Sequence, residues 1–286
     1  MTTPTDFHQR LGRNILVLNT ELVRGRGRCA LLDMDGTLSL IRAGWREVML
    51  RLCTDALQRT GTGESLEHLR AVSLDFINRL TGQPTLFQMR ALTAQVKQRG
   101  GNPHQADFYK EQYLARLREH IGDRLDALRA GWDPPDRYQV RGSLMLLEGL
   151  RDRGVHLYLA SGTDHDSVIE ELGLLQLADF FQDRVYGARS GCAVDTKKRV
   201  IELIRKRHRI SGPELLVFGD GVVEIQEGKG AGGVTVGAAT LEEPAAEDGA
   251  AGFDPSKLEQ LRGVAADILV PHWEEAELLL RYLYAE

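Results

Sequence analysis

Cysteine is scarce in this sequence. Its three cysteines among 286 residues, Cys29, Cys53 and Cys192, are odd in number and lie far apart along the chain. Such spacing fits neither a disulfide framework nor the paired cysteines of a zinc site. We therefore expect all three to behave as small buried hydrophobic residues.

The sequence also lacks long apolar runs and an excess of positive charge. No segment approaches the roughly 18 uninterrupted apolar residues of a membrane-spanning helix, and the opening MTTPTDFHQRLGRN has no apolar signal-peptide core. The sequence contains 36 Lys and Arg residues and 41 Asp and Glu residues, which gives a formal net charge of −5. A nucleic-acid backbone needs a basic field. We expect a cytoplasmic protein that binds neither membranes nor nucleic acid.

Hydrophobic residues make up 42% of the sequence, which is enough for a large core. Apolar residues at mixed helical spacing over 6–23 predict a helix in an N-terminal extension, residues 1–27. The apolar run that ends at Asp33 predicts a short buried strand. Residues 40–135 then contain four consecutive amphipathic helical segments with no strand between them.

Strands and helices alternate from residue 136 to 286, as in βαβ units with a parallel sheet, and residues 242–257 read as a polar loop. The predicted fold class is α/β, with a core formed by residues 28–39 and 136–286 and a helical insertion over 40–135. Ligands bind at the carboxyl ends of strands in such sheets. The insertion would therefore cover the site like a lid.

Four polar motifs stand where predicted strands end or helices begin. They are DMDGT at 33–37, SGT at 161–163, DTKKRV at 195–200 and GDGVVE at 219–224. We expect all four to converge on one edge of the sheet.

Clustered carboxylates repel one another unless a cation or a proton lies between them. Asp33, Asp220 and Glu224 together form an oxygen-ligand set that suits Mg²⁺. An aspartate can also attack a phosphoryl group and form an acyl phosphate. Asp35 stands in the same turn as Asp33, so it can move the proton that such a reaction requires.

The four motifs, in this order, resemble those of the haloacid dehalogenase superfamily of phosphohydrolases, from about residue 28 to the end without the helical insertion. The resemblance implies a Rossmann-like core with an inserted α-helical cap domain. It also implies that Asp33 is the nucleophile and Asp35 the general acid/base, whose backbone carbonyl also binds the metal. Ser161 and Gly162 would hold the phosphoryl oxygens, and Asp220 would bind Mg²⁺.

The resemblance also implies a lysine that binds the phosphoryl group, and its position is ambiguous because Lys197 and Lys198 are adjacent. In related phosphatases it precedes apolar helix positions by three, four and seven residues, a spacing that favours Lys197. The last acidic position of the fourth motif is usually aspartate, and here it is Glu224. Glu224 can still hold Mg²⁺, directly or through a bound water, but it also suits the first turn of a helix.

Several candidate residues have a structural interpretation as well. Ser161 can cap a following helix. In the cap, Arg42 and Gln88 could contact substrate, although an arginine on an amphipathic helix usually lies on a solvated face. The loop at residues 81–85 could face the pocket, and an ordinary connection between helices is the more common role.

The sequence thus predicts a Mg²⁺-dependent phosphatase acting on a small phosphorylated metabolite, a sugar or polyol phosphate, through a phosphoaspartate on Asp33. Two alternatives remain open. One is a phosphomutase that returns the phosphoryl group to a sugar, and the other is a non-catalytic binding module of the same fold.

Overall fold

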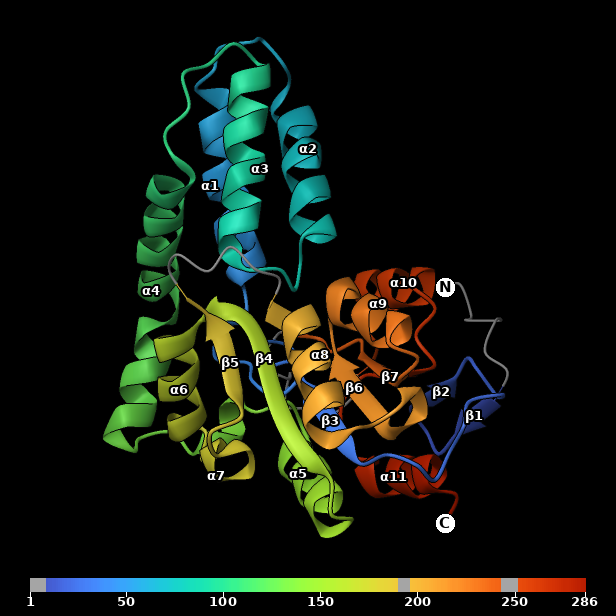
Figure 1. The fold of residues 1–286 in the computed structure, drawn as a ribbon. Coiled ribbons are helices and arrows are strands. Elements are labelled where there is room, and N and C mark those ends of the chain that lie inside the picture. Colours follow the sequence, from blue (N-terminus) through green and yellow to red (C-terminus); the bar gives the residue numbers. More distant parts are fainter. Residues whose placement is uncertain (1–8, 190–195, 243–251) are drawn as a thin grey trace.

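One mixed sheet forms the centre of the protein in the computed structural model, which describes residues 9–189, 196–242 and 252–286 (Figure 1). Within these residues the sheet has eight strands in the order β1-β2-β8-β7-β6-β3-β4-β5. Strands β3 to β8 are parallel, so the predicted α/β class is confirmed. The strands are β1 (Gln9–Leu11), β2 (Ile15–Val17), β3 (Cys29–Leu32), β4 (His156–Asp164), β5 (Val185–Ala188), β6 (Leu215–Gly219), β7 (Val234–Ala238) and β8 (Ile268–Val270).

The prediction of an N-terminal helix over 6–23, and so of a helical extension over 1–27, is wrong. From residue 9 on, this part of the chain contains the antiparallel hairpin β1–β2, and β2 pairs antiparallel with β8. Gly12 makes the turn with a φ of 56°, which favours glycine. The buried run Ile15–Val17 meets a free strand edge, and that pairing overrides its weak helical periodicity. Residues 6–8 lie outside the described residues.

The insertion contains four helices, as the sequence predicts. They are α1 (Trp45–Gln58), α2 (Leu66–Arg79), α3 (Thr85–Gln98) and α4 (Ala106–Ala130). The two connections to the core run side by side, since Leu40 N donates to Tyr138 O at 2.7 Å and Val140 N donates to Leu38 O at 3.0 Å. The cap helices α1 to α3 stand above the sheet in Figure 1.

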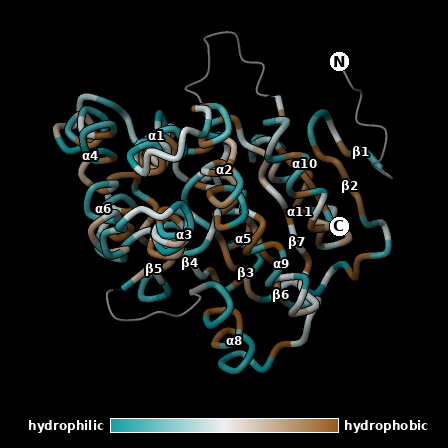
Figure 2. The backbone as a smooth tube through the Cα atoms, turned by 90° about the horizontal axis from the view of Figure 1, so that it is seen from above, coloured by the Kyte–Doolittle hydropathy of each residue, from teal (hydrophilic) through white to brown (hydrophobic). Residues whose placement is uncertain are grey.

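Helices cover both faces of the parallel strands because side chains alternate along each strand. Leu31 packs with α8 on one face, whereas Ala30 and Leu32 belong to the apolar cluster on the other face. Figure 2 shows the buried strands mainly in brown and the outer turns of α4 and α8 largely in teal. The core helices are α5 (Ser143–Asp152), α6 (His165–Leu174), α7 (Ala178–Phe181), α8 (Thr196–His208), α9 (Val222–Gly230), α10 (Pro255–Gly263) and α11 (Ala276–Tyr284).

Helix α10 corrects the predicted loop over 242–257, of which residues 243–251 lie outside the described residues. The helix begins at Pro255, and the Asp254 side chain caps it by accepting from Lys257 N at 2.9 Å. Aspartate followed by proline is a helix-start signal that the polar composition of the segment obscures. No helix within the described residues combines the length and apolarity needed to cross a membrane. Cys29 and Cys53 are buried, and Cys192 falls outside the described residues.

Asp267, immediately before β8, is the polar link between the hairpin and the parallel strands. Its side chain is 2% exposed and accepts hydrogen bonds from Asn19 Nδ2 at 2.7 Å, Lys229 Nζ at 2.7 Å, and Thr235 N and Oγ1 at 2.9 Å. Its backbone carbonyl accepts from Leu18 N. One carboxylate therefore satisfies donors from three separate segments.

We expect Asp267→Ala to lower the free energy of unfolding by about 2–4 kcal/mol, because it leaves several buried donors without a partner. Urea unfolding followed by circular dichroism measures this change. The control is Asp152→Ala, whose carboxylate is 73% exposed, with an expected effect within about 0.5 kcal/mol. Equal effects of the two substitutions would contradict this role of Asp267.

Candidate active site

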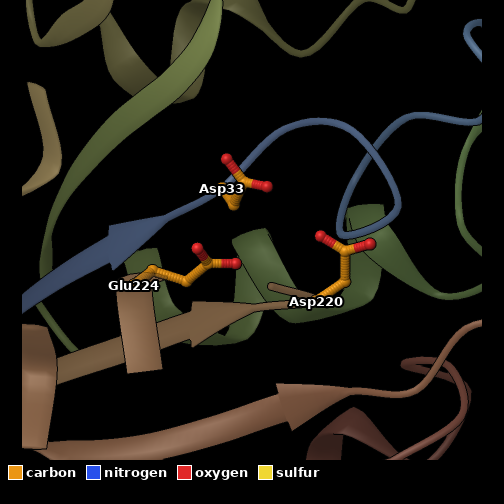
Figure 3. Close-up of side chains that lie close together, drawn as sticks. All are labelled: Asp33, Asp220 and Glu224. Carbon is orange, nitrogen blue, oxygen red and sulfur yellow. The ribbon is translucent and has the colours of Figure 1, made fainter. Parts of the chain in front are cut away.

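Three carboxylates meet at the carboxyl edge of the sheet. Asp33 follows β3, Asp220 follows β6, and Glu224 stands in the first turn of α9. One ligand oxygen from each side chain lies within 4.8 Å of those of the other two. Figure 3 shows the three side chains directed toward a common space. The parallel topology brings them together, because all of their strands end on the same side.

Lys197, at the start of α8, contacts two of these carboxylates. Its Nζ lies 3.0 Å from Asp33 Oδ1 and 2.6 Å from Glu224 Oε2, and its side chain is 1% exposed. Lys198 is exposed. Of the two adjacent lysines, the structure therefore places Lys197 at Asp33. Glu224 Oε1 also accepts from Gly221 N at 2.5 Å, so both oxygens of Glu224 are engaged.

Burial raises the pKa of the Asp33 carboxyl well above its usual value, while the Lys197 ammonium lowers it and Glu224 raises it further. Burial also works to lower the pKa of Lys197, but Asp33 and Glu224 outweigh it and keep that pKa above its usual value. The lysine therefore remains charged. A cation at the carboxylates favours the ionised form of Asp33, the form that can attack an electrophile.

Asp35 lines the same cavity as Asp33 but has side-chain partners of its own. Thr163 Oγ1 donates to Asp35 Oδ2 at 2.8 Å, and Arg42 Nε lies 3.8 Å from Asp35 Oδ1. Asp35 Oδ1 itself is shielded from solvent and accepts no hydrogen bond from any residue that the structure describes. The two aspartates of the motif therefore have different partners, which suits different chemical tasks.

Arg42 is not on the solvated face of a helix. It precedes α1, is 9% exposed, and donates from Nε and Nη2 to Glu171 of α6 at 2.6–3.1 Å. Burial raises the pKa of the Glu171 carboxyl to about 7, although Arg42 lowers it. The partner that buries Arg42 lies 129 residues away in the sequence.

A cavity of about 70 Å³ lies between the motifs and the cap. Ser161 belongs to β4, and the N-cap position of α6 is Asp164, so the capping interpretation of Ser161 is wrong. The cavity is lined by both motif aspartates, by the candidate phosphate-binding residues and by the cap: Asp33, Asp35, Arg42, Trp45, Met49, Thr81, Gly82, Gln83, Thr85, Gln88, Tyr113, Ser161, Gly162, Thr163 and Asp220.

The cap loop at residues 81–85 does more than connect two helices, because it packs directly against the second and fourth motifs. A Cβ added at Gly162 would lie 2.5 Å from Gln83 O, and one added at Gly82 would lie 2.8 Å from Glu224 Oε2. Gln88 of α3 is 4% exposed and its Nε2 donates to Ile77 O at 3.4 Å. The loop therefore closes the site on the side opposite the sheet.

Lys257 is a site residue that the sequence analysis misses. Its Nζ donates to Asp220 Oδ2 and to Glu242 Oε1, each at 2.6 Å. Burial works to lower the pKa of Lys257, but the two carboxylates outweigh it and keep that pKa above its usual value. The Asp254–Pro255 pair is a signal that predicts the start of α10, and therefore places Lys257 in the first turn of a helix. It does not predict the contact between Lys257 and Asp220.

Comparison with known proteins agrees with the resemblance drawn from the motifs. A family model described as haloacid dehalogenase-like hydrolase matches residues 28–232, which include both flanks of the cap and all four motifs. No curated protein matches the chain.

Solved structures share the fold at low sequence identity. A haloacid dehalogenase-like protein of unknown function from Agrobacterium tumefaciens is 18% identical, with 91% of this chain and 100% of that chain covered and a TM-score of 0.57. A β-phosphoglucomutase from Clostridium difficile is 12% identical, with coverages of 91% and 97% and a TM-score of 0.58. A predicted phosphatase from Clostridium acetobutylicum is 17% identical, with coverages of 89% and 99% and a TM-score of 0.52.

The close contact at Gly162 yields a test of the seated cap loop. We expect Gly162→Ala to push the backbone of Gln83 away and to reduce turnover of phosphate esters by about tenfold or more, since small misplacements at a site have large effects on rate. The matched control is Gly122→Ala in α4, where an added Cβ meets nothing within 4 Å. Steady-state kinetics on both variants measure the effect, and an unaltered rate in Gly162→Ala would contradict the arrangement.

Proposed function

Because this chain belongs to the family of haloacid dehalogenase-like hydrolases, we propose that it is a Mg²⁺-dependent phosphatase that hydrolyses a small phosphate monoester through a phosphoaspartate on Asp33. The observation that carries the proposal is the placement of Asp33 between Lys197 and the cavity, with Asp35 beside it and in a separate environment. Residues 40–135 serve as the cap in this proposal.

In the first step, a carboxylate oxygen of Asp33 attacks phosphorus and the bond to the leaving oxygen breaks. Asp35 gives its proton to that oxygen, so the product leaves as an alcohol. Lys197 offsets negative charge at Asp33, and Ser161 with Gly162 holds the phosphoryl oxygens. These three residues line or adjoin the same cavity as both aspartates.

In the second step, water attacks the phosphoaspartate and releases inorganic phosphate. Asp35, now ionised, takes a proton from this water, which regenerates both carboxyl groups in their starting forms. Thr163 and Arg42 hold Asp35 from two sides. The seated cap loop limits the water that reaches the intermediate.

The donor set fits Mg²⁺, since a buried cluster of carboxylate oxygens needs a cation and Mg²⁺ prefers oxygen ligands. Asp33 and Asp220 would hold the ion, together with the backbone carbonyl of Asp35. Glu224 would hold Lys197 beside the site through Oε2 and would reach the ion through a bound water. The bound ion would neutralise charge on the transferring phosphoryl group.

The small cavity favours a small substrate. Its volume of about 70 Å³ compares with roughly 300–1,000 Å³ for pockets that hold drug-sized ligands. The phosphoryl group lies against Ser161 and Gly162 in this proposal, which leaves the sugar or polyol part beneath the cap, near Gln88. Such a substrate enters while the cap loop is further from the sheet.

The division of labour between the two aspartates is testable. We expect Asp33→Asn to reduce phosphate release by at least about 10³-fold because no acyl phosphate can form, whereas Asp35→Asn slows breakdown of the intermediate so that phosphoenzyme accumulates. Phosphate release from a panel of esters with Mg²⁺, and intact-mass detection of an 80 Da adduct, roughly the mass of a phosphoryl group, measure both effects.

The same experiment separates the alternatives. A phosphomutase would convert glucose 1-phosphate or mannose 1-phosphate to an isomer, with a bisphosphate primer, instead of releasing phosphate. A non-catalytic binding module would release phosphate from no ester and would form no adduct. Undiminished release by Asp33→Asn would reject the phosphoaspartate mechanism.

We also expect Arg42 to act as a positioning residue for Asp35. Lysine cannot reproduce the two-pronged contact with Glu171, so Arg42→Lys should lower kcat by about tenfold with little change in KM. Arg116→Lys, which alters a half-exposed ion pair with Asp55, is the control and should leave both constants unchanged. A raised KM at unchanged kcat would instead make Arg42 a substrate contact.

A further inference from the structure

Lys257 occupies an unusual position for a cation. It lies in the first turn of α10, where its backbone N–H bonds the capping Asp254. The amino end of a helix carries a partial positive charge, which disfavours a lysine there. The side chain is nevertheless 3% exposed and is held by Asp220 Oδ2 and Glu242 Oε1, both at 2.6 Å. The position of Lys257 is therefore explained by its ion pairs with the two carboxylates, and not by a contribution to the stability of α10.

The ammonium also lies close to the turn of the first motif. A Cβ added at Gly36 would lie 2.2 Å from Asp220 Oδ2 and 2.9 Å from Lys257 Nζ. Gly36 has a φ of 73°, and because it has no side chain, it makes room for the contact between Asp220 and Lys257. Lys257 therefore reaches the carboxylate cluster itself and is not a distant surface partner of Asp220.

The charges of the site divide into two groups. Lys197 contacts Asp33 and Glu224, whereas Lys257 contacts Asp220 and Glu242. Asp220 belongs to the cluster that could hold Mg²⁺, and Lys257 engages one of its two oxygens. A divalent ion near Asp220 meets both the repulsion of this ammonium and its competition for the carboxylate.

We propose that Lys257 is a resident counter-ion of Asp220 that opposes Mg²⁺ binding and stabilises the metal-free protein. This inference rests on the proposed function only through its metal site. It assigns to this chain a positioning residue whose charge sets how tightly the ion is held, while Glu242 keeps the ammonium in place when Asp220 turns to the metal.

The test is Mg²⁺ titration by isothermal calorimetry on wild type, Lys257→Met and the charge-retaining Lys257→Arg. We expect Lys257→Met to lower the Kd for Mg²⁺ by about three- to tenfold, because the opposing charge is gone, and Lys257→Arg to stay near the wild-type Kd. Melting temperatures should show Lys257→Met less stable than wild type in EDTA, with a larger rise on addition of Mg²⁺.

The control is Lys229→Met, which removes an ion pair of similar length, 2.7 Å to Asp267, away from the metal site. It should lower the melting temperature in EDTA without changing the Kd for Mg²⁺. If Lys257→Met does not fold, Lys257→Gln removes the charge while it keeps a donor, and the same decrease in Kd is expected.

The outcomes separate the two proposals. Binding by wild type with an equal or weaker Kd in Lys257→Met would overturn the role of Lys257 and leave the proposed metal in place. Absence of Mg²⁺ binding in wild type and in the Lys257 variants alike would overturn both. Binding that is measurable only after removal of the charge would support the counter-ion role strongly.

Discussion

The repulsion between carboxylates at one sheet edge is the constraint on which the rest of the site depends. Parallel strands deliver Asp33 and Asp220 to the same side, and the first turn of α9 adds Glu224. Buried anions at such short separations need cations. Lys197 supplies one of them because the apolar face of α8 packs on the sheet and fixes the start of that helix beside Asp33.

In the proposed mechanism, the cap completes this electrostatic arrangement by limiting the water that reaches the site. Charge interactions strengthen where the effective dielectric constant is low. Gly82 and Gly162 allow the cap loop to approach the motifs so closely that a single methyl group would disturb the contact. In the proposed mechanism, access of substrate and exclusion of solvent depend on the same few backbone atoms, and so does the strength of the ion pairs beneath them.

The sequence reveals those parts of the site that local patterns encode. Apolar strands ending in short polar motifs place Asp33 and Asp220 correctly at the sheet edge, and helical periodicity identifies the insertion. It does not reveal pairings between distant segments. Arg42 meets Glu171 from 129 residues away, and Lys257 reaches Asp220 only because α10 packs against α9. Local patterns do not predict the pairing of β2 with β8 for the same reason, since the two strands are far apart in the sequence.

That last pairing has a consequence for the order in which the protein is built. β2 comprises residues 15–17 and its partner β8 residues 268–270, so almost the whole chain separates them. During synthesis the N-terminal segment leaves the ribosome long before β8 exists, and contacts of such high sequence separation form slowly. Until then β2 can pair only with β1, so the edge of β2 that later meets β8 stays open, and closing that edge of the sheet belongs to the final stage of folding.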